Sequence, residues 1–148
     1  GVLGARADLG ETTLALKRTL ERIHDDKALD IELHGAEGLS FQGERQDLDE
    51  MLGNLMDNAC KWAKSRVRVQ GRQEGGWLLL SVEDDGPGIP ENALSEAIDR
   101  GRRLDEATPG SGLGLSIVRD VAELYEGKLD LAHSQLGGLA ARLKLPAG

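Results

Sequence analysis

Apolar residues recur at helical spacing in three segments of this 148-residue chain, at residues 11–23, 44–62 and 113–125. When the chain advances about 100° per residue, the apolar side chains of each segment gather on one side. The pattern therefore predicts three amphipathic helices, each with one side toward a core. The expected inward positions are Leu14, Leu16, Leu20 and Ile23 in the first helix, Leu48, Met51, Leu52, Leu55, Ala59 and Trp62 in the second, and Leu113, Ile117, Val118, Val121 and Leu124 in the third.

Shorter segments alternate apolar and polar residues or run apolar, as strands do. Residues 29–33 are the first, and we expect residues 39–42 to pair with them across a turn at 35–38. Gly75 and Gly76 suit the turn of a hairpin. The other predicted strands are residues 67–70 and 77–82 on either side of that turn, and residues 128–132 and 139–145 near the end of the chain.

The segment before the third helix is different. Pro90 suits the first position of a short helix over residues 91–99, and residues 100–110 lack periodicity and contain glycine and proline, which predicts a mobile loop. The order of elements is then α β β α β β, loop, α β β. We expect residues 1–148 to form one domain of α+β class, a two-layer α/β sandwich with a mixed sheet packed on about three helices.

Composition and charge exclude several functions. The chain has 18 basic and 26 acidic residues and a formal net charge of −8, which argues against binding to nucleic acid through a basic face. No apolar run approaches the ~20 residues of a membrane span, so we expect no direct membrane contact from this fragment. A single cysteine, Cys60, and three scattered histidines favour neither a disulfide nor a zinc site. Because the chain starts at Gly1 without methionine, we expect a fragment or a processed chain.

The second predicted helix also carries a polar stripe. Five side chains lie within about 40° of a common line on it, by the same helical geometry. Amide oxygens suit Mg²⁺, which keeps several waters and shares its other positions with phosphates, and a lysine adds a point charge for phosphate. The alternative is an ordinary solvated helix face. The stripe comprises Asp47, Glu50, Asn54, Asn58 and Lys61.

The strand at residues 77–82 leads into an acidic pair and the tight turn Gly86-Pro87-Gly88. Glycines at such a turn let backbone N–H groups come close to a ligand. A carboxylate held there, at Asp85, is suited to accept a hydrogen bond from an exocyclic amine such as that of adenine. The alternative is an acidic residue in an ordinary β-turn, where Asp-Gly is common.

A second glycine cluster, Gly110, Gly112 and Gly114, opens the third predicted helix. The N-terminus of a helix presents unpaired N–H groups and the positive end of its dipole, so this cluster is a candidate phosphate cradle. It is neither a Walker A loop nor a good Rossmann fingerprint, and a glycine-rich hinge is the alternative. Arginines at residues 100, 102 and 103 are suited to neutralise phosphate charge, or they form a solvated patch.

The three signals occur in one order: Asn-x-x-x-Asn-Ala-x-Lys, then Asp-x-Gly-x-Gly, then Gly-x-Gly-x-Gly-Leu. Together they resemble the N, G1 and G2 boxes of the ATP-binding domain shared by sensor histidine kinases, Hsp90, type II topoisomerases and MutL. Residues 46–127 resemble the PhoQ-like branch of the histidine kinases in particular. This resemblance implies the Bergerat ATP-binding fold of the GHKL proteins, with a mobile ATP lid over about residues 86–112.

The resemblance also implies site residues. Asn58, with Asn54 beside it, would bind Mg²⁺, and Asp85 would hold the adenine amine. Asn58, Lys61 and Arg103 would act in catalysis, and Glu50 would reach an incoming imidazole. The implied nucleotide-binding residues are Asn54, Asn58, Lys61, Trp62, Asp85, Gly86, Gly88, Ile89, Arg100, Arg103, Gly110, Ser111, Gly112, Leu113, Gly114 and Leu115.

Two features refine the implied function. Hydrolysing members of the superfamily place a glutamate where Asn54 stands, which favours phosphoryl transfer to a protein over hydrolysis. No histidine lies in a His-Glu/Asp-x-x-x-Pro context. We therefore expect the catalytic half of a histidine kinase, which binds Mg-ATP and donates the γ-phosphoryl group to a histidine on a dimerisation domain absent from this chain.

In this interpretation a response regulator acts downstream, and the chain is a cytoplasmic domain of a bacterial inner-membrane sensor in a two-component system. Two alternatives remain open at this point. One is a nucleotide-sensing module without phosphotransfer, and the other is a serine kinase of the anti-sigma type.

Overall fold

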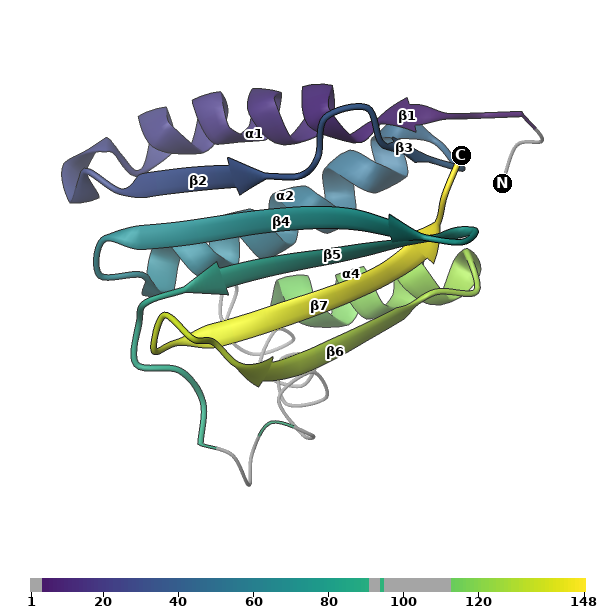
Figure 1. Cartoon of the computed structure of the whole chain (residues 1–148). Helices are drawn as coiled ribbons and strands as arrows, with labels where there is room; N and C mark the ends of the chain where they lie inside the picture. Colours follow the sequence, from purple (N-terminus) through teal and green to yellow (C-terminus); the bar gives the residue numbers. More distant parts are fainter. Residues whose placement is uncertain (1–3, 91–93, 95–112) are drawn as a thin grey trace.

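A five-stranded mixed sheet forms one layer of the molecule (Figure 1). The computed structural model describes residues 4–90, 94 and 113–148, so the expected short helix at 91–99 and the loop at 100–110 lie outside the described residues. Strands β2 and β4 are parallel, and every other neighbouring pair in this sheet is antiparallel. In spatial order the strands are β2 (Asp30–His34), β4 (Arg66–Glu74), β5 (Trp77–Asp84), β7 (Leu139–Pro146) and β6 (Lys128–His133).

Three helices form the second layer and cover one face of the sheet, so the expected two-layer α+β architecture is confirmed. They are α1 (Leu9–Ile23), α2 (Arg45–Trp62) and α4 (Leu113–Leu124). Figure 1 looks onto the other face of the sheet, with α2 and α4 behind the strands. Among the described residues, no helix is long and apolar enough to span a membrane.

The segment predicted as the partner of residues 29–33 pairs elsewhere. β3 (Ser40–Phe41) is antiparallel to β1 (Ala7–Asp8), a short strand that the pattern did not predict. The physical reason lies in the turn after β2. Gly35 has φ +78° and lies so close to β4 that an added Cβ would be 2.2 Å from the Gly71 carbonyl oxygen. The chain therefore leaves the sheet at this point, while β2 pairs in parallel with β4.

Helix α1 begins where predicted to within two residues, and its buried face only partly matches the predicted one. The carboxylate of Asp8 caps it by accepting a hydrogen bond from the Glu11 N–H at 2.8 Å. Thr12 and Thr13 are fully buried because each hydroxyl donates to a carbonyl oxygen of the preceding turn. Leu20 is buried and Leu16 packs against the core, as predicted, but Leu14 and Ile23 are 40% and 61% exposed, so the prediction was wrong at these two positions.

Helices α2 and α4 follow their predicted bounds closely and bury most of the expected positions. Trp62 and Leu124 are exceptions, with 58% and 81% of their surfaces exposed. Each lies in the last turn of its helix, where a face defined by periodicity alone extends past the core. After α4, Glu126 adopts the left-handed conformation with φ +60°. Gly127 is needed for space, since an added Cβ would be 2.1 Å from the Lys144 carbonyl oxygen.

Along strand β5, buried and half-buried residues alternate strictly. Leu78, Leu80, Val82 and Asp84 are buried on the side that meets the helices. This phase places a carboxylate at the end of an otherwise apolar row, directly before the predicted glycine turn. The buried row of β5 therefore ends at the candidate site.

Candidate functional site

The second half of α2 supplies the polar stripe of the candidate site. Buried side chains of this helix, such as Leu55 and Met56, hold it against the core. Asn54 and Asn58 are half-buried on the stripe. The Asn54 amide nitrogen donates to the Glu50 carbonyl oxygen at 2.7 Å, so the carbonyl end of this amide is the end left for a ligand. The Glu50 side chain is exposed, as an encounter with a second protein would require.

The start of α4 lies directly against this stripe. A Cβ added at Gly114 would be 3.1 Å from both Cβ and Oδ1 of Asn54. Any larger residue would push the amide, so the glycine allows the first turn of α4 to approach α2 closely. Leu113 is the first residue of this helix, and the predicted glycines before it lie outside the described residues. Leu115 is 5% exposed and belongs to the core, so its side chain is not available to a ligand.

The exit from β5 lies against the other end of the stripe. A Cβ added at Gly86 would be 2.2 Å from the Trp62 carbonyl oxygen, so no side chain fits there. Gly88 has φ +73°, a conformation that favours glycine, and a Cβ added there would be 3.3 Å from the Gly138 carbonyl oxygen. Ile89 follows as a half-buried residue. Along α2, residues 54 and 62 are about 12 Å apart at 1.5 Å per residue.

Three segments that are distant in the sequence therefore converge as expected: the α2 stripe, the glycine turn after β5 and the start of α4. Trp62 is mostly exposed beside this turn, and its ring is free to contact a ligand. The remaining predicted residues lie outside the described residues. These are Arg100, Arg103, Gly110, Ser111 and Gly112.

Asp84 is the buried acid of this site, with 2% of its surface exposed. Its Oδ1 atom accepts hydrogen bonds from the Gly86 N–H at 2.9 Å and the Leu139 N–H at 3.4 Å. Among the residues that the structure describes, nothing donates to Oδ2. Burial raises the pKa of Asp84, and the two N–H groups offset part of this effect. A buried carboxylate oxygen without a donor is costly, and it marks a place for a ligand N–H.

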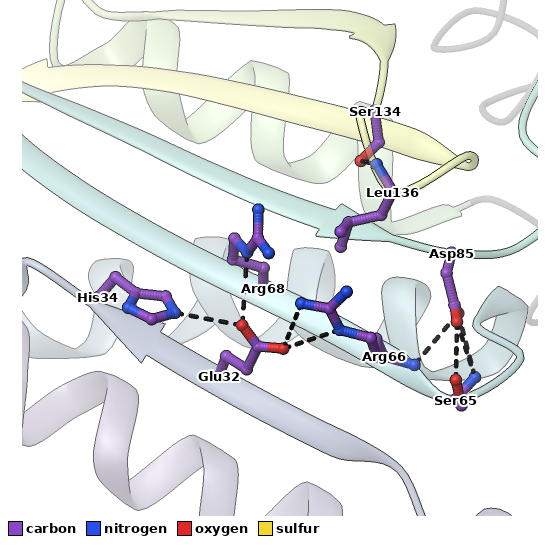
Figure 2. A network of polar contacts seen from close by, with 8 residues as sticks. All are labelled: Glu32, His34, Ser65, Arg66, Arg68, Asp85, Ser134 and Leu136. Carbon is purple, nitrogen blue, oxygen red and sulfur yellow. Dashed lines mark hydrogen bonds and ion pairs between the residues drawn. The ribbon is translucent and has the colours of Figure 1, made fainter.

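Asp85, the predicted adenine acceptor, has a different environment, which Figure 2 shows. Its Oδ1 accepts from the N–H groups of Lys64 at 2.8 Å and Arg66 at 3.1 Å, and its Oδ2 accepts from the Ser65 hydroxyl at 2.8 Å. Burial by itself would raise the pKa of Asp85, but hydrogen bonds from Ser65, Arg66 and Lys64 lower it to about 2. Both oxygens are thus engaged in closing the connection between α2 and β4.

Sequence reasoning had a signal that would have singled out Asp84. In this chain the spacing Asp-x-Gly-x-Gly begins at Asp84 and includes Gly86 and Gly88. The period of two along β5 also places Asp84 in phase with Leu80 and Val82, toward the helices. Asp85 is out of phase by one residue and points to the other side.

Lys61 is held by groups that the sequence did not suggest. Its ammonium lies 3.3 Å from Oδ2 of Asp57, one helical turn earlier, and Oδ1 of Asp57 is 2.8 Å from the His24 ring. Lys27 donates to the carbonyl oxygens of Cys60 and Lys61 at 2.8 and 2.9 Å. The spacing of Asp57 and Lys61 could have been read from the sequence, but the contacts from the end of α1 could not.

The described residues hold no cluster of three or more His, Cys, Asp or Glu side chains suited to a metal ion. A cation at this site would therefore rely on the amide oxygens of Asn58 and Asn54, with phosphates and water as its other ligands. This is a ligand set that Mg²⁺ accepts. Cys60 is buried, and burial raises the pKa of its thiol to about 11, so it packs as an inert apolar residue.

Comparison with known families matches residues 43–148 to the family described as histidine kinase-, DNA gyrase B- and HSP90-like ATPases. The sensor protein kinase CarS of Pseudomonas aeruginosa is 47% identical over 143 residues, which cover 97% of this chain and 32% of that protein. The sensor protein PhoQ of Escherichia coli K12 is 41% identical over 133 residues, which cover 90% of this chain and 27% of that protein. The chain thus spans about a third of the length of these relatives.

Solved structures show the same fold. The mycobacterial sensor histidine kinase MprB aligns with a TM-score of 0.78 and 30% identity over 97% of both chains. The ATP binding domain of PrrB from Mycobacterium tuberculosis aligns with a TM-score of 0.80 and 25% identity, again over 97% of both chains. The catalytic domain of histidine kinase ThkA, in a nucleotide-free form, has a TM-score of 0.84 at 23% identity, and this likeness concerns the fold alone.

Proposed function

The chain belongs to the family of histidine kinase-, DNA gyrase B- and HSP90-like ATPases, and we propose that it is the ATP-binding catalytic domain of a sensor histidine kinase, over residues 1–148. In this proposal it binds Mg-ATP and donates the γ-phosphoryl group to a histidine on a dimerisation domain outside this chain. The observation that carries the proposal is the buried carboxylate of Asp84, with one oxygen lacking a donor among the described residues, beside a glycine turn that packs closely against the end of α2.

Asp84 is the adenine acceptor in this proposal, in place of Asp85. Its Oδ2, to which no described residue donates, would accept a hydrogen bond from the exocyclic amine. Gly86 and Gly88 would let the base lie against the backbone, and the exposed ring of Trp62 is available for stacking. Asp85 would instead keep the α2–β4 connection closed, through its four donors.

The phosphates would lie toward the other end of the α2 stripe. Asn58 and Asn54 would hold Mg²⁺ through their amide oxygens, and Lys61 would provide a positive charge for phosphate. Bound Mg²⁺ would neutralise charge on the triphosphate. The first turn of α4, which begins at Leu113, would offer the phosphates the positive end of its helix dipole.

Catalysis in this proposal is positioning and charge neutralisation rather than proton abstraction from water. The residue that precedes Asn58 by one turn is Asn54, an amide that cannot serve as a general base. Arg100 and Arg103 are proposed to neutralise phosphate charge, as the resemblance implies. Glu50 is exposed one turn earlier on the stripe and is proposed to meet the incoming imidazole.

The proposed partners follow from the family. The phosphoacceptor histidine lies on a dimerisation domain of the same kinase, and a response regulator receives the phosphoryl group from it. The parent is proposed to be a bacterial inner-membrane sensor with this domain in the cytoplasm. In the chain itself, His24 is paired with Asp57 and His34 with Glu32. Neither histidine is the first residue of a His-Glu/Asp-x-x-x-Pro motif.

Nucleotide binding is tested first by the thermal unfolding of the chain with Mg-ATP and with Mg-GTP. Ligand at about 100 times its dissociation constant adds ~2.7 kcal/mol to the free energy of unfolding. We expect stabilisation by ATP and much less by GTP, because guanine presents a carbonyl oxygen where adenine presents the amine. Equal stabilisation by both nucleotides would contradict the role of Asp84.

Phosphotransfer is tested by adding a dimerisation domain from a related sensor kinase. Labelled ATP should leave the isolated chain unlabelled and should label the histidine of the added domain. Nucleotide binding without transfer to any related dimerisation domain would favour the nucleotide-sensing alternative. Label on a serine of a separate protein would favour the anti-sigma type of kinase.

A further inference from the structure

The uncovered face of the sheet is hollowed into a groove of about 710 Å³. Outward side chains of β4, β5, β7 and β6 line it, with His34 of β2 at its border. The groove lies on the opposite side of the sheet from Asp84, whose side chain is in phase with the buried row of β5. It is therefore separate from the candidate nucleotide site, and nothing in the proposed function uses it.

The strand register places the lining residues in two adjacent rows that cross the sheet. One row consists of Arg72, Leu79, Lys144 and Lys128, each paired with the next across neighbouring strands. The second row consists of Gln70, Ser81, Arg142 and Asp130 in the same strand order. The groove thus contains four cations and one carboxylate, on a chain whose formal net charge is −8.

This positive charge is only partly compensated. Lys128 and Lys144 are directly opposite each other on antiparallel strands, and like charges in that position are destabilising. Lys144 lies over the Trp77 ring at 4.4 Å from its centroid, Lys128 lies 3.6 Å from Asp130, and Arg72 forms an ion pair with Glu74. Arg142 forms no ion pair with any residue that the structure describes. A local arrangement that opposes stability in this way is the kind found at functional sites.

The other half of the same face makes a useful contrast. There Oε2 of Glu32 accepts from Arg66 at 2.7 Å, and Oε1 of Glu32 lies 3.4 Å from Arg68 and 3.2 Å from His34 (Figure 2). The hydrogen bond from Arg66, with those from His34 and the charge of Arg68, lowers the pKa of Glu32 to about 2. Two arginines near β2 therefore share one carboxylate within the fold. On β6 and β7, Lys128 has a partner in Asp130, whereas Arg142 and Lys144 form no ion pair with any described residue.

We propose that this groove docks an extended acidic segment of a partner protein. The cations of the first row are spread over three strand spacings, roughly 14 Å at ~4.8 Å each. A single phosphate would reach one end of such a row. An extended peptide places alternate side chains ~6.8 Å apart, so two or three of its carboxylates reach along the row together. Gln70 and Ser81 add hydrogen-bond donors in the second row, beside the four cations.

The test uses the whole chain and a fluorescent hexaglutamate peptide, with binding measured by anisotropy at low salt. Replacing two cations, Lys128→Gln with Lys144→Gln, should weaken binding about tenfold, or ~1.4 kcal/mol. Arg142→Gln should weaken it by a smaller factor. The matched control is Arg18→Gln with Arg22→Gln, which removes the same charge from the exposed side of α1 and should change binding less than twofold.

Several outcomes would overturn the proposal. Equal weakening by the α1 control would mean that the peptide senses only overall charge. Tighter binding of inorganic tripolyphosphate than of the peptide, or binding to anionic phosphatidylglycerol vesicles that the groove variant abolishes, would assign the groove to another ligand. A circular dichroism melt checks that the groove variant is folded. Unchanged Mg-ATP binding by the folded variant shows that peptide binding at the groove is tested independently of the proposed kinase function.

Discussion

The two faces of the central sheet use charge in opposite ways. On the face covered by helices, Asp84 is the one buried carboxylate among the described residues, and burial raises its pKa. On the uncovered face, ion pairs around Glu32 lie in contact with water, and the hydrogen bond from Arg66 lowers the Glu32 pKa to about 2. A carboxylate thus lowers the stability of the fold on one face and is an ordinary ion-pair partner on the other.

Asp84 and Asp85 show how finely this difference is set. They are consecutive in sequence, yet one carboxylate is buried and has an oxygen to which no described residue donates, whereas the other accepts hydrogen bonds from four donors. A vacant buried acceptor costs stability and is available to a ligand, whereas a saturated one stabilises the fold and has nothing left to offer. Four substitutions test this contrast, from the largest expected effect to the smallest.

Asp84→Asn should weaken Mg-ATP binding by about a hundredfold or more, ~2.8 kcal/mol, because the amide can present a donor to the adenine amine. Stability at pH 7 should not fall. The folded-state pKa of Asp84 is raised, so its charged form disfavours the fold as pH rises above the ordinary value, and a neutral amide avoids this cost. Calorimetric titration and thermal unfolding measure the two effects. Unchanged affinity would remove Asp84 from the site.

Asp85→Ala should do the reverse and lower the free energy of unfolding by about 1–2 kcal/mol, as losing a capping carboxylate does. ATP affinity should change less than threefold. Because the pKa of Asp85 is lowered to about 2, its stabilisation is present above the ordinary carboxylate value and is lost as pH falls toward 2. Urea unfolding at pH 7 and pH 3 compares the two proteins. A large loss of ATP binding in a stable variant would restore Asp85 as the acceptor.

Gly114→Ala tests the contact between α4 and α2. The new methyl group would lie 3.1 Å from Oδ1 of Asn54 and should turn this amide away from a cation. We expect Mg-ATP affinity to fall about fivefold, ~1 kcal/mol, while stability stays level because alanine favours a helix. Titrations with and without Mg²⁺ separate the effects. A loss that is equal in both would show that the methyl group blocks the nucleotide and leaves the amide in place.

Glu32→Gln should have the smallest effect, a decrease of about 1–2 °C in the unfolding midpoint, as expected for an exposed ion pair. The Glu32 contribution is present above its ordinary pKa and fades as pH falls toward 2, and 1 M salt should reduce it further. ATP binding should be unchanged. A larger decrease in ATP affinity than in stability would mean that the two faces of the sheet are coupled.

The sequence predicted the helices and strands better than it predicted which of them pack or pair with one another. Periodicity placed α2, α4 and the β4–β5 hairpin, because each pattern depends on residues that are close in the chain. It assigned residues 39–42 to the wrong partner, since pairing with β1 depends on where the chain turns at Gly35. It also predicted that Leu14 and Leu124 face the core, although both are exposed, because the elements packed against a helix decide how much of its apolar face is buried.

What the sequence by itself determined is the family and the order of its three motifs, because glycines, amides and acids at fixed spacing suit only a few kinds of site. The tertiary structure decided which acid faces the ligand, through the phase of β5 against the helices. It also decided which cations on the uncovered face are paired, because the register of five strands brings Lys128 opposite Lys144 and Glu32 beside Arg66. Those contacts join residues that are far apart in the chain, and local patterns carry no information about such distances.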